Sequence, residues 1–221
     1  LARPLHVFDA DKLSGDINVR YAINGEKLAA LDNREYELSE SMVVIADQAK
    51  ALGIGGIIGG EETGCVEDTV NVFVECALFD PISVAKTGRK LQINSDARYR
   101  FERGVDPQSI VWGMEVATRL ITELCGGEVS HVVKAGDVPA PRNSFDLRID
   151  RIRELGGVDV DADQAIAILK SLGFEVTGNA PVITAVAPTW RPDIVGEADL
   201  VEEVLRIVGF DKIPTVPLER E

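Results

Sequence analysis

The sequence has 221 residues, of which 45% are hydrophobic and 27% charged, and its formal net charge is −14. This length allows two domains that each bury a core, and the composition excludes wholesale disorder. No apolar run reaches the roughly 18 residues that a membrane span needs. The acidic balance excludes a general nucleic-acid binder, because non-specific affinity comes mostly from neutralising phosphates. Three cysteines without the paired spacing of a zinc site favour a reduced, cytoplasmic setting.

The first 46 residues predict a scaffold with one notable side chain. The chain begins without methionine, and we expect it to be a piece of a longer protein. His6 lies between apolar neighbours, where a lone histidine is more often structural than catalytic, so both interpretations stay open. From Ile17 to Ala46, short alternating runs separated by Asn-Gly and Asp-Asn dipeptides predict an antiparallel meander.

A glycine-rich segment, GIGGIIGGEETG, occupies residues 53–64. Its glycines indicate positive φ angles or a close approach of the backbone to a neighbouring group. We reject a dinucleotide-binding loop, because no strand–loop–helix unit with an acidic residue about twenty positions later accompanies it. Backbone packed against a flat substrate group is a better interpretation, given the apolar Ile57 and Ile58 between the glycines.

Glu75 ends the apolar run VNVFVE. A carboxylate at the end of a buried strand is costly unless it has a partner. One interpretation pairs it with an arginine such as Arg98 or Arg103. The other makes it a hydrogen-bond acceptor that recognises a substrate.

A basic segment follows, in a protein that is otherwise acidic. Its cations are Lys86, Arg89, Lys90, Arg98, Arg100 and Arg103. Such a cluster suggests a phosphate-bearing partner that is met at one place only. The alternative is a solvated turn and helix in which Asp96, Glu102 and Asp106 act as counter-ions.

The second half of the sequence predicts a helix, a linker and a second domain. Asp106 and Pro107 read as N-cap and first residue of a helix to about Cys125, which stops at two glycines. We expect the apolar stripe of this helix to be core: Ile110, Met114, Ala117, Leu120, Ile121 and Leu124. Two prolines without periodicity predict a linker over residues 137–144, between domains at 1–136 and 145–216.

In the second domain we expect strands at 145–149, 174–177 and 182–186, with helices at 151–155, 162–172 and up to 208. The whole chain is therefore predicted to be α+β, and helices followed by a two-stranded wing suggest a winged-helix-like module.

Four carboxylates gather at the start of the last helix: Asp193, Asp199, Glu202 and Glu203. The last three stand at i, i+3 and i+4, so they share one helix face. Hard oxygen ligands in this arrangement suit Mg²⁺. The alternative is an acidic first turn that complements the helix dipole.

Four motifs in order resemble one protein family. They are PLHVFD at residues 4–9, GGIIGGEETG at 55–64, SDARYRFERGVDP at 95–107 and APTWRPDIVGEADLVEEVLRIVGFDKIP at 187–214. The first three resemble the B3/B4 domain of the β subunit of bacterial phenylalanyl-tRNA synthetase, and the fourth resembles its B5 domain. Together they cover nearly the whole sequence.

The resemblance implies an editing pocket in the first domain. His6 occupies the position of the family's pocket histidine, Gly56 and Gly59 form a wall, and Ser95 and Ala97 match the small residues of the floor. Glu75 matches the glutamate that accepts a hydrogen bond from the hydroxyl of a misattached tyrosine. The family usually has Thr in place of Ser95, so we expect a slightly looser wall. Arg89, Lys90 and Arg98 are candidates for tRNA contacts.

The resemblance also implies partners. The family's assembly is an α₂β₂ heterotetramer that binds tRNA(Phe), with ATP bound by the α subunit rather than by this chain. Its Mg²⁺ site, shared with the α subunit, maps to the four carboxylates named above. We expect hydrolysis of Tyr from mischarged tRNA(Phe); the competing hypothesis is a non-catalytic scaffold that holds the α subunit and tRNA.

Overall fold

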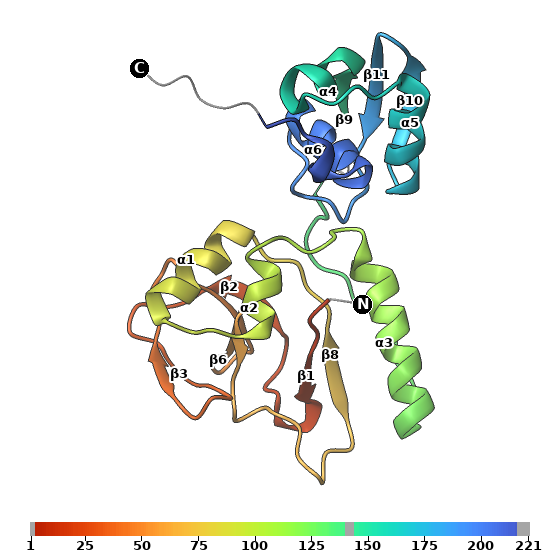
Figure 1. Cartoon of the computed structure of the whole chain (residues 1–221). Helices are drawn as coiled ribbons and strands as arrows, with labels where there is room; N and C mark the ends of the chain where they lie inside the picture. The colour runs from red at the N-terminus through yellow and green to blue at the C-terminus, as the bar shows by residue number, and fades with distance from the viewer. Residues whose placement is uncertain (1–2, 140–143, 216–221) are drawn as a thin grey trace, which may run out of the picture. The chain divides into compact units, whose positions relative to one another are not determined.

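The computed structural model describes residues 3–139 and 144–215, and the chain divides into two compact units, Leu1–Asp137 and Val138–Glu221. Each unit has its own hydrophobic core. Figure 1 gives the elements of both. Half of the predicted linker, residues 140–143, and residue 216 of the predicted second domain lie outside the described residues.

The N-terminal unit is built on short antiparallel strands. These are β1 (His6–Asp9), β2 (Asn18–Tyr21), β3 (Lys27–Ala29), β4 (Glu35–Glu37), β5 (Val43–Ala46), β6 (Ala51–Ile54), β7 (Ile58–Gly59) and β8 (Val72–Glu75). They form a four-stranded sheet of order β2-β5-β6-β7 and two separate antiparallel pairs, the hairpin β3-β4 and the pair β1-β8. A short 3₁₀ helix, η1 (Ala10–Lys12), follows β1.

The predicted meander is wrong in its pairing. The Asn24-Gly25 turn forms, with Gly25 at φ +81°, but it does not pair the strands on its two sides. Instead β2 pairs with β5, and β3 pairs with β4 across the Asp32-Asn33 turn. Dipeptides identify turns, but the partner of a strand depends on which apolar faces close the core, and that is not a local property.

Two helices close the core of this unit, α1 (Pro81–Leu91) and α2 (Asp96–Phe101). Asp80 caps α1 by accepting from the N–H of Ser83, with proline in the first turn. Ser95 caps α2 in the same way by accepting from the N–H of Arg98. The core includes Phe8, Leu52, Ile57, Val84 and Phe101.

The third helix, α3, spans Ser109–Cys125 and ends at Gly126, at φ +75°. It starts two residues later than predicted, because Asp106 and Pro107 form a turn before it. The expectation that its whole apolar stripe is core is wrong: Ala117 is buried, whereas Leu120 is 44% and Leu124 82% exposed. Arg3 fixes the start of the helix by donating to Oγ of Ser109 at 2.8 Å.

The C-terminal unit packs three helices with one sheet. Its elements are β9 (Ser144–Arg148), α4 (Ile149–Gly156), α5 (Ala162–Ser171), β10 (Glu175–Asn179), β11 (Val182–Val186), α6 (Glu197–Val208) and η2 (Phe210–Lys212). The sheet has the antiparallel order β10-β11-β9, so the expected two-stranded wing gains a third strand. The α+β class is confirmed, and the winged-helix comparison stays a prediction.

Candidate functional site

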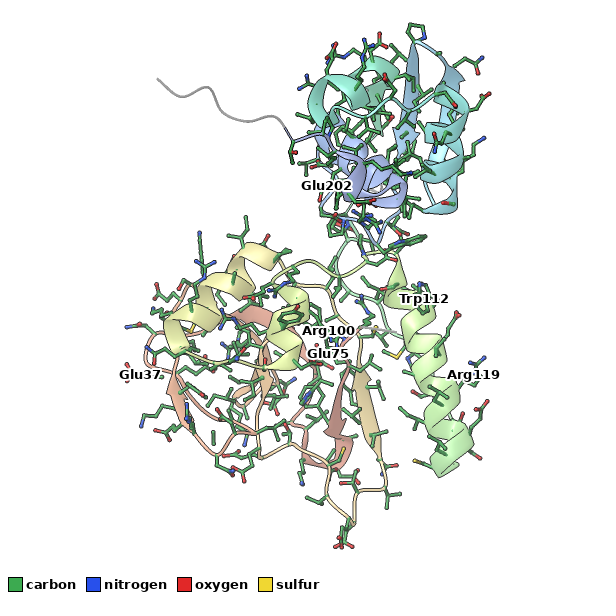
Figure 2. The ribbon with its side chains drawn as sticks, viewed as in Figure 1. Glu37, Glu75, Arg100, Trp112, Arg119 and Glu202 are labelled. Atoms are coloured by element: carbon green, nitrogen blue, oxygen red, sulfur yellow. The ribbon has the colours of Figure 1, made fainter. Side chains whose placement is uncertain are left out.

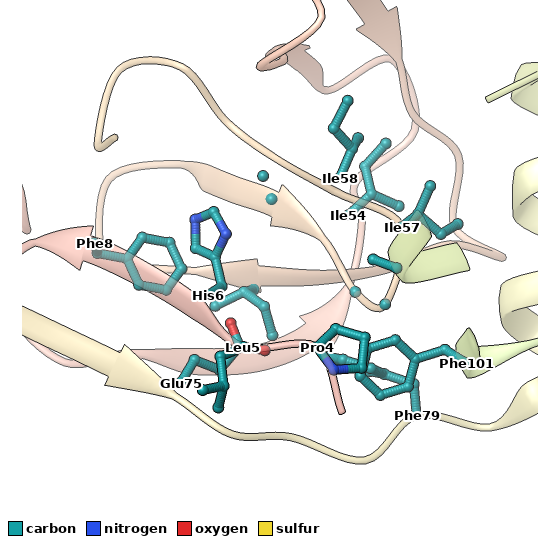
Figure 3. Close-up of a pocket in the computed structure, with 16 residues that line it drawn as sticks. Pro4, Leu5, His6, Phe8, Ile54, Ile57, Ile58, Glu75, Phe79 and Phe101 are labelled. Atoms are coloured by element: carbon teal, nitrogen blue, oxygen red, sulfur yellow. The ribbon is translucent and has the colours of Figure 1, made fainter. Parts of the chain in front are cut away.

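The N-terminal unit contains a cavity between β1, the glycine segment and α2. Its empty volume, including space open to solvent, is about 450 Å³. The lining residues are Pro4, Leu5, His6, Phe8, Ile45, residues 53–59, Glu75, Phe79, Ala97 and Phe101. Figure 3 shows them. Five of the predicted pocket residues therefore lie around one cavity: His6, Gly56, Gly59, Glu75 and Ala97.

The pair of strands β1 and β8 places the two polar side chains of the cavity. His6 is the cross-strand partner of Glu75 in the antiparallel register. Directly opposed residues project to the same face of a sheet, so the imidazole and the carboxyl reach the cavity together. In Figure 3 they lie at one side of the cavity, away from Phe79 and Phe101.

The Glu75 carboxyl has no hydrogen bond or ion pair within residues 3–139 and 144–215. Neither Arg98 nor Arg103 reaches it, because both pair with Glu102. Burial raises the pKa of Glu75 from 4.5 to about 7, since desolvation disfavours the charged form. The interpretation that an arginine neutralises Glu75 is therefore wrong.

His6 is held by aromatic and backbone contacts. Its ring meets Phe8 edge-on, with 4.3 Å between centroids. Nε2 is buried and has no hydrogen-bond partner among the described residues. Burial lowers the pKa of His6 below 6.5, so the imidazole is neutral at pH 7. A neutral imidazole nitrogen in a cavity can bond water or a substrate.

The glycines are required by close packing of the backbone. A Cβ atom at Gly59 would overlap the His6 ring. At Gly56, where φ is +71°, a Cβ atom would lie 2.9 Å from Cδ2 of Phe79. The predicted close approach of a flat group to glycine backbone is therefore present, but the flat groups are the protein's own rings.

Ser95 and Ala97 differ in their relation to the cavity. Ala97 lines it, whereas Ser95 is not among the lining residues. The Ser95 hydroxyl donates to the carbonyl of Ile57 and so connects the start of α2 to the glycine segment. Ser95 thus supports the wall rather than forming its surface.

The sequence did not indicate Phe79 and Phe101 as site residues. Their rings meet edge-on with 5.1 Å between centroids, and both line the cavity. An apolar residue four positions after Glu75 carries no distinctive local signal. Only the packing of the Phe79 ring against the backbone of Gly55 and Gly56 identifies this residue as part of the site.

Three of the six cations of the basic segment, Arg98, Arg100 and Arg103, are neutralised internally. Arg98 donates to Glu102 and to the carbonyl of Ile93, and its stem packs where a side chain at position 88 would be. Arg100 pairs with Asp96. These contacts favour the salt-bridged alternative for α2.

Arg89 and Lys90 lie on the exposed face at the end of α1. Lys90 donates to the hydroxyl of Ser39, at 2.8 Å. These two side chains stay candidates for phosphate contacts, whereas Arg98 donates its hydrogen bonds to Glu102 and to the carbonyl of Ile93.

The four acidic residues of the C-terminal unit do not converge as metal ligands. Arg191 pairs with Asp193 and with Glu203, which is 5% exposed and also pairs with Arg206. These arginines hold the pKa of Glu203 at about 2.

The other two carboxylates of this set have separate roles or none. Asp199 accepts from the N–H groups of Val195 and Gly196 and so caps the start of α6. Glu202 is exposed on α6 (Figure 2). Across residues 3–139 and 144–215 no group of three or more His, Cys, Asp or Glu side chains is arranged to hold a metal. In this structure Asp193, Asp199 and Glu203 accept from guanidinium or backbone N–H groups, and the Mg²⁺ site on these four carboxylates stays a prediction.

No helix within the described ranges combines the length and apolarity that crossing a bilayer requires.

Comparison with known proteins assigns both units. The family model of the B3/4 domain matches residues 1–126, and that of the tRNA synthetase B5 domain matches residues 145–210. The phenylalanine–tRNA ligase beta subunit of Nitrobacter winogradskyi is 52% identical over 219 residues, which are 99% of this chain and 27% of that protein. That of Rhodospirillum rubrum is 54% identical over 222 residues, 100% of this chain and 28% of that protein. The chain thus spans well under a third of these relatives.

One solved structure, an N-terminal fragment of the phenylalanyl-tRNA synthetase beta-subunit from Pyrococcus horikoshii, aligns with 91% of this chain and 58% of that fragment. The identity is 21% and the TM-score 0.44, and the family assignment does not use this alignment. The family models and the sequence relatives agree without it. The chain belongs to the B3/4 domain family and, with its B5 domain, to the phenylalanine–tRNA ligase beta subunits.

Proposed function

We propose that the N-terminal unit hydrolyses tyrosine that has been attached in error to tRNA(Phe), as part of a ligase that attaches phenylalanine to that tRNA. The observation that carries the proposal is the Glu75 carboxyl, which faces a cavity with mainly apolar walls and has no partner among the described residues. A buried polar group without a partner is costly, and a ligand that bonds it recovers that cost.

The difference between tyrosine and phenylalanine is one hydroxyl group. An apolar pocket rejects an added hydroxyl only weakly, whereas a site that must bond a hydroxyl rejects the analogue without it by as much as about 10⁴–10⁵. A second, hydrolytic site with Glu75 at one side of an aromatic-sized cavity supplies the stronger discrimination. It retains tyrosine for hydrolysis and releases phenylalanine.

Hydrolysis itself needs little from this chain. An aminoacyl ester is already activated, so a water molecule held against it supplies much of the rate through proximity. His6 lines the same cavity as Glu75, which supports a role in positioning this water or the substrate. Glu75 opposes it across the strand pair, so both act on one bound group.

Partners belong to the proposal as well. We infer an α subunit that binds ATP, assembly as an α₂β₂ heterotetramer, and a tRNA(Phe) whose phosphates meet Arg89 and Lys90. Because Asp193 and Glu203 are paired with Arg191, we assign no step to a magnesium ion on this chain.

A second candidate function is a scaffold that holds the α subunit or the tRNA without catalysis. The exposed apolar side chains of α3, with Leu124 at 82%, favour a covering partner on that helix. The two functions do not exclude each other, and deacylation separates them.

The test is release of tyrosine and of phenylalanine from charged tRNA(Phe) by the complete ligase that contains this chain. We expect faster release of tyrosine, and Glu75→Ala should reduce this preference by at least about tenfold, since the hydroxyl loses its partner. Glu67→Ala removes an exposed carboxylate of the same unit and should change nothing. Equal preference in the Glu75 variant and the parent would refute the role of Glu75, and failure of both to release tyrosine would favour the scaffold.

A further inference from the structure

A second hollow adjoins the Glu75 cavity. Its empty volume, open solvent included, is about 420 Å³, and Val19, Val43, Leu78 and Thr87 contribute to its walls. Gly55 and Phe79 line both hollows. The Phe79 ring and the backbone of Gly55 are therefore the partition between them.

This partition is rigid. A Cβ atom at Gly55 would lie 2.8 Å from Cε1 of Phe79, and one at Gly56 would lie 2.9 Å from Cδ2, so two edges of the ring rest on glycine backbone. Phe101 meets the ring edge-on. Phe79 is only 9% exposed. These contacts hold the ring in place between the two hollows, because close-packed side chains transmit displacement to their neighbours.

We propose that Phe79 is a specificity-determining residue of this pocket, the wall that limits it to an aromatic group of one six-membered ring. This rests on the proposed editing function and deepens it. Glu75 selects aminoacyl groups that carry a hydroxyl, and Phe79 excludes aromatic side chains larger than one six-membered ring. Replacing the ring with a smaller side chain joins the two hollows and extends the apolar end of the pocket, so that a bicyclic aromatic aminoacyl group enters.

The neighbour of Phe79 in the sequence offers a matched control. Leu78 lines the second hollow and not the Glu75 cavity. Leu78→Ala therefore enlarges the second hollow and leaves the partition in place. A gain that comes from general loosening of the core would appear in this variant too, whereas a gain that comes from the partition would not.

The experiment uses the complete ligase with tRNA(Phe) charged either with tyrosine or, chemically, with 6-hydroxy-2-naphthylalanine, which keeps a hydroxyl for Glu75. We expect Phe79→Leu and Phe79→Ala to raise release of 6-hydroxy-2-naphthylalanine by at least about tenfold over the parent, the smallest effect typical of pocket size changes. Leu78→Ala should stay at the parent value. Thermal unfolding of each protein identifies variants that have lost their fold, and Phe79→Leu keeps most of the core volume if Phe79→Ala does not fold.

Three outcomes decide the proposal. Faster release of the bicyclic aminoacyl group by the Phe79 variants alone supports it. Unchanged release of that group by variants that still release tyrosine overturns it, and so does an equal increase in Leu78→Ala. If the parent releases no tyrosine, the editing function fails separately. Calorimetric binding of 6-hydroxy-2-naphthylalanine amide to the 221-residue chain then decides: tighter binding by Phe79→Leu supports the partition and unchanged binding overturns it.

Discussion

At the scale of single residues, Glu75 shows how burial and function are linked. A carboxyl that no arginine neutralises is expensive to keep, and burial raises its pKa to about 7. Evolution could remove the cost with glutamine or leucine, and the cavity beside the residue gives a reason to retain it. Its cross-strand neighbour His6 is neutral for the same physical reason.

Glu75 should make the N-terminal unit less stable as pH rises. The folded-state pKa lies above the unfolded value of 4.5, so its contribution is fully present below pH 4.5 and is lost as pH rises through about 7. At about 1.4 kcal/mol per pKa unit, Glu75→Gln should raise the free energy of unfolding at pH 8 by up to about 3 kcal/mol relative to the parent. The gain should shrink towards zero near pH 4.5.

Denaturant unfolding of this unit between pH 4.5 and 8 makes that measurement. Titration of His6 has the opposite sign, because its lowered pKa removes stability as pH falls through 6.5. The difference between Glu75→Gln and the parent cancels this contribution. An unchanged difference across the range, or one as small as that of Glu67→Gln, would contradict the burial of Glu75.

At the scale of elements, the loop before α6 is organised by Arg191. Its guanidinium joins Asp193 in the loop to Glu203 on the buried side of the helix. Asp199, in the first turn of the helix, accepts from the N–H groups of Val195 and Gly196 at the start of α6. The sequence indicated an acidic cluster, and the alternative of an acidic first turn describes Asp199 best.

Arg191→Gln should destabilise the C-terminal unit by about 2–3 kcal/mol at pH 7, because breaking a buried pair leaves a charge without its main partner, here partly relieved by Arg206. The folded-state pKa of Glu203, about 2, lies below its ordinary 4.5, so the effect should be full above pH 4.5 and lost as pH falls towards 2. Denaturant unfolding at pH 7 and at pH 3 checks both statements. Arg153→Gln, which removes an exposed pair with Asp159, is the control, and equal losses from the two variants would contradict the assignment.

At the scale of the whole molecule, each unit closes its own core. We therefore expect two calorimetric unfolding transitions, since cooperative unfolding follows a shared core. At pH 8, Glu75→Gln should raise the midpoint of one transition, and Arg191→Gln should lower the midpoint of the other. A single transition that moves with both substitutions would show that the units unfold together.

The sequence by itself determined the local features. It predicted the α+β class, the helix that ends at Cys125 and the strand over Val182–Val186, because caps, glycines and alternation act within a few residues. It also indicated His6, Glu75, Gly56, Gly59 and Ala97, which the fold gathers around one cavity.

Only the tertiary structure decided which groups meet. It paired β2 with β5 and joined Arg191 to both Asp193 and Glu203. It also left Glu75 without a partner and placed the Phe79 ring on glycine backbone. The reason is physical: pairing, desolvation and close contact depend on distances between residues far apart in the chain, and no local pattern of residue types encodes those distances.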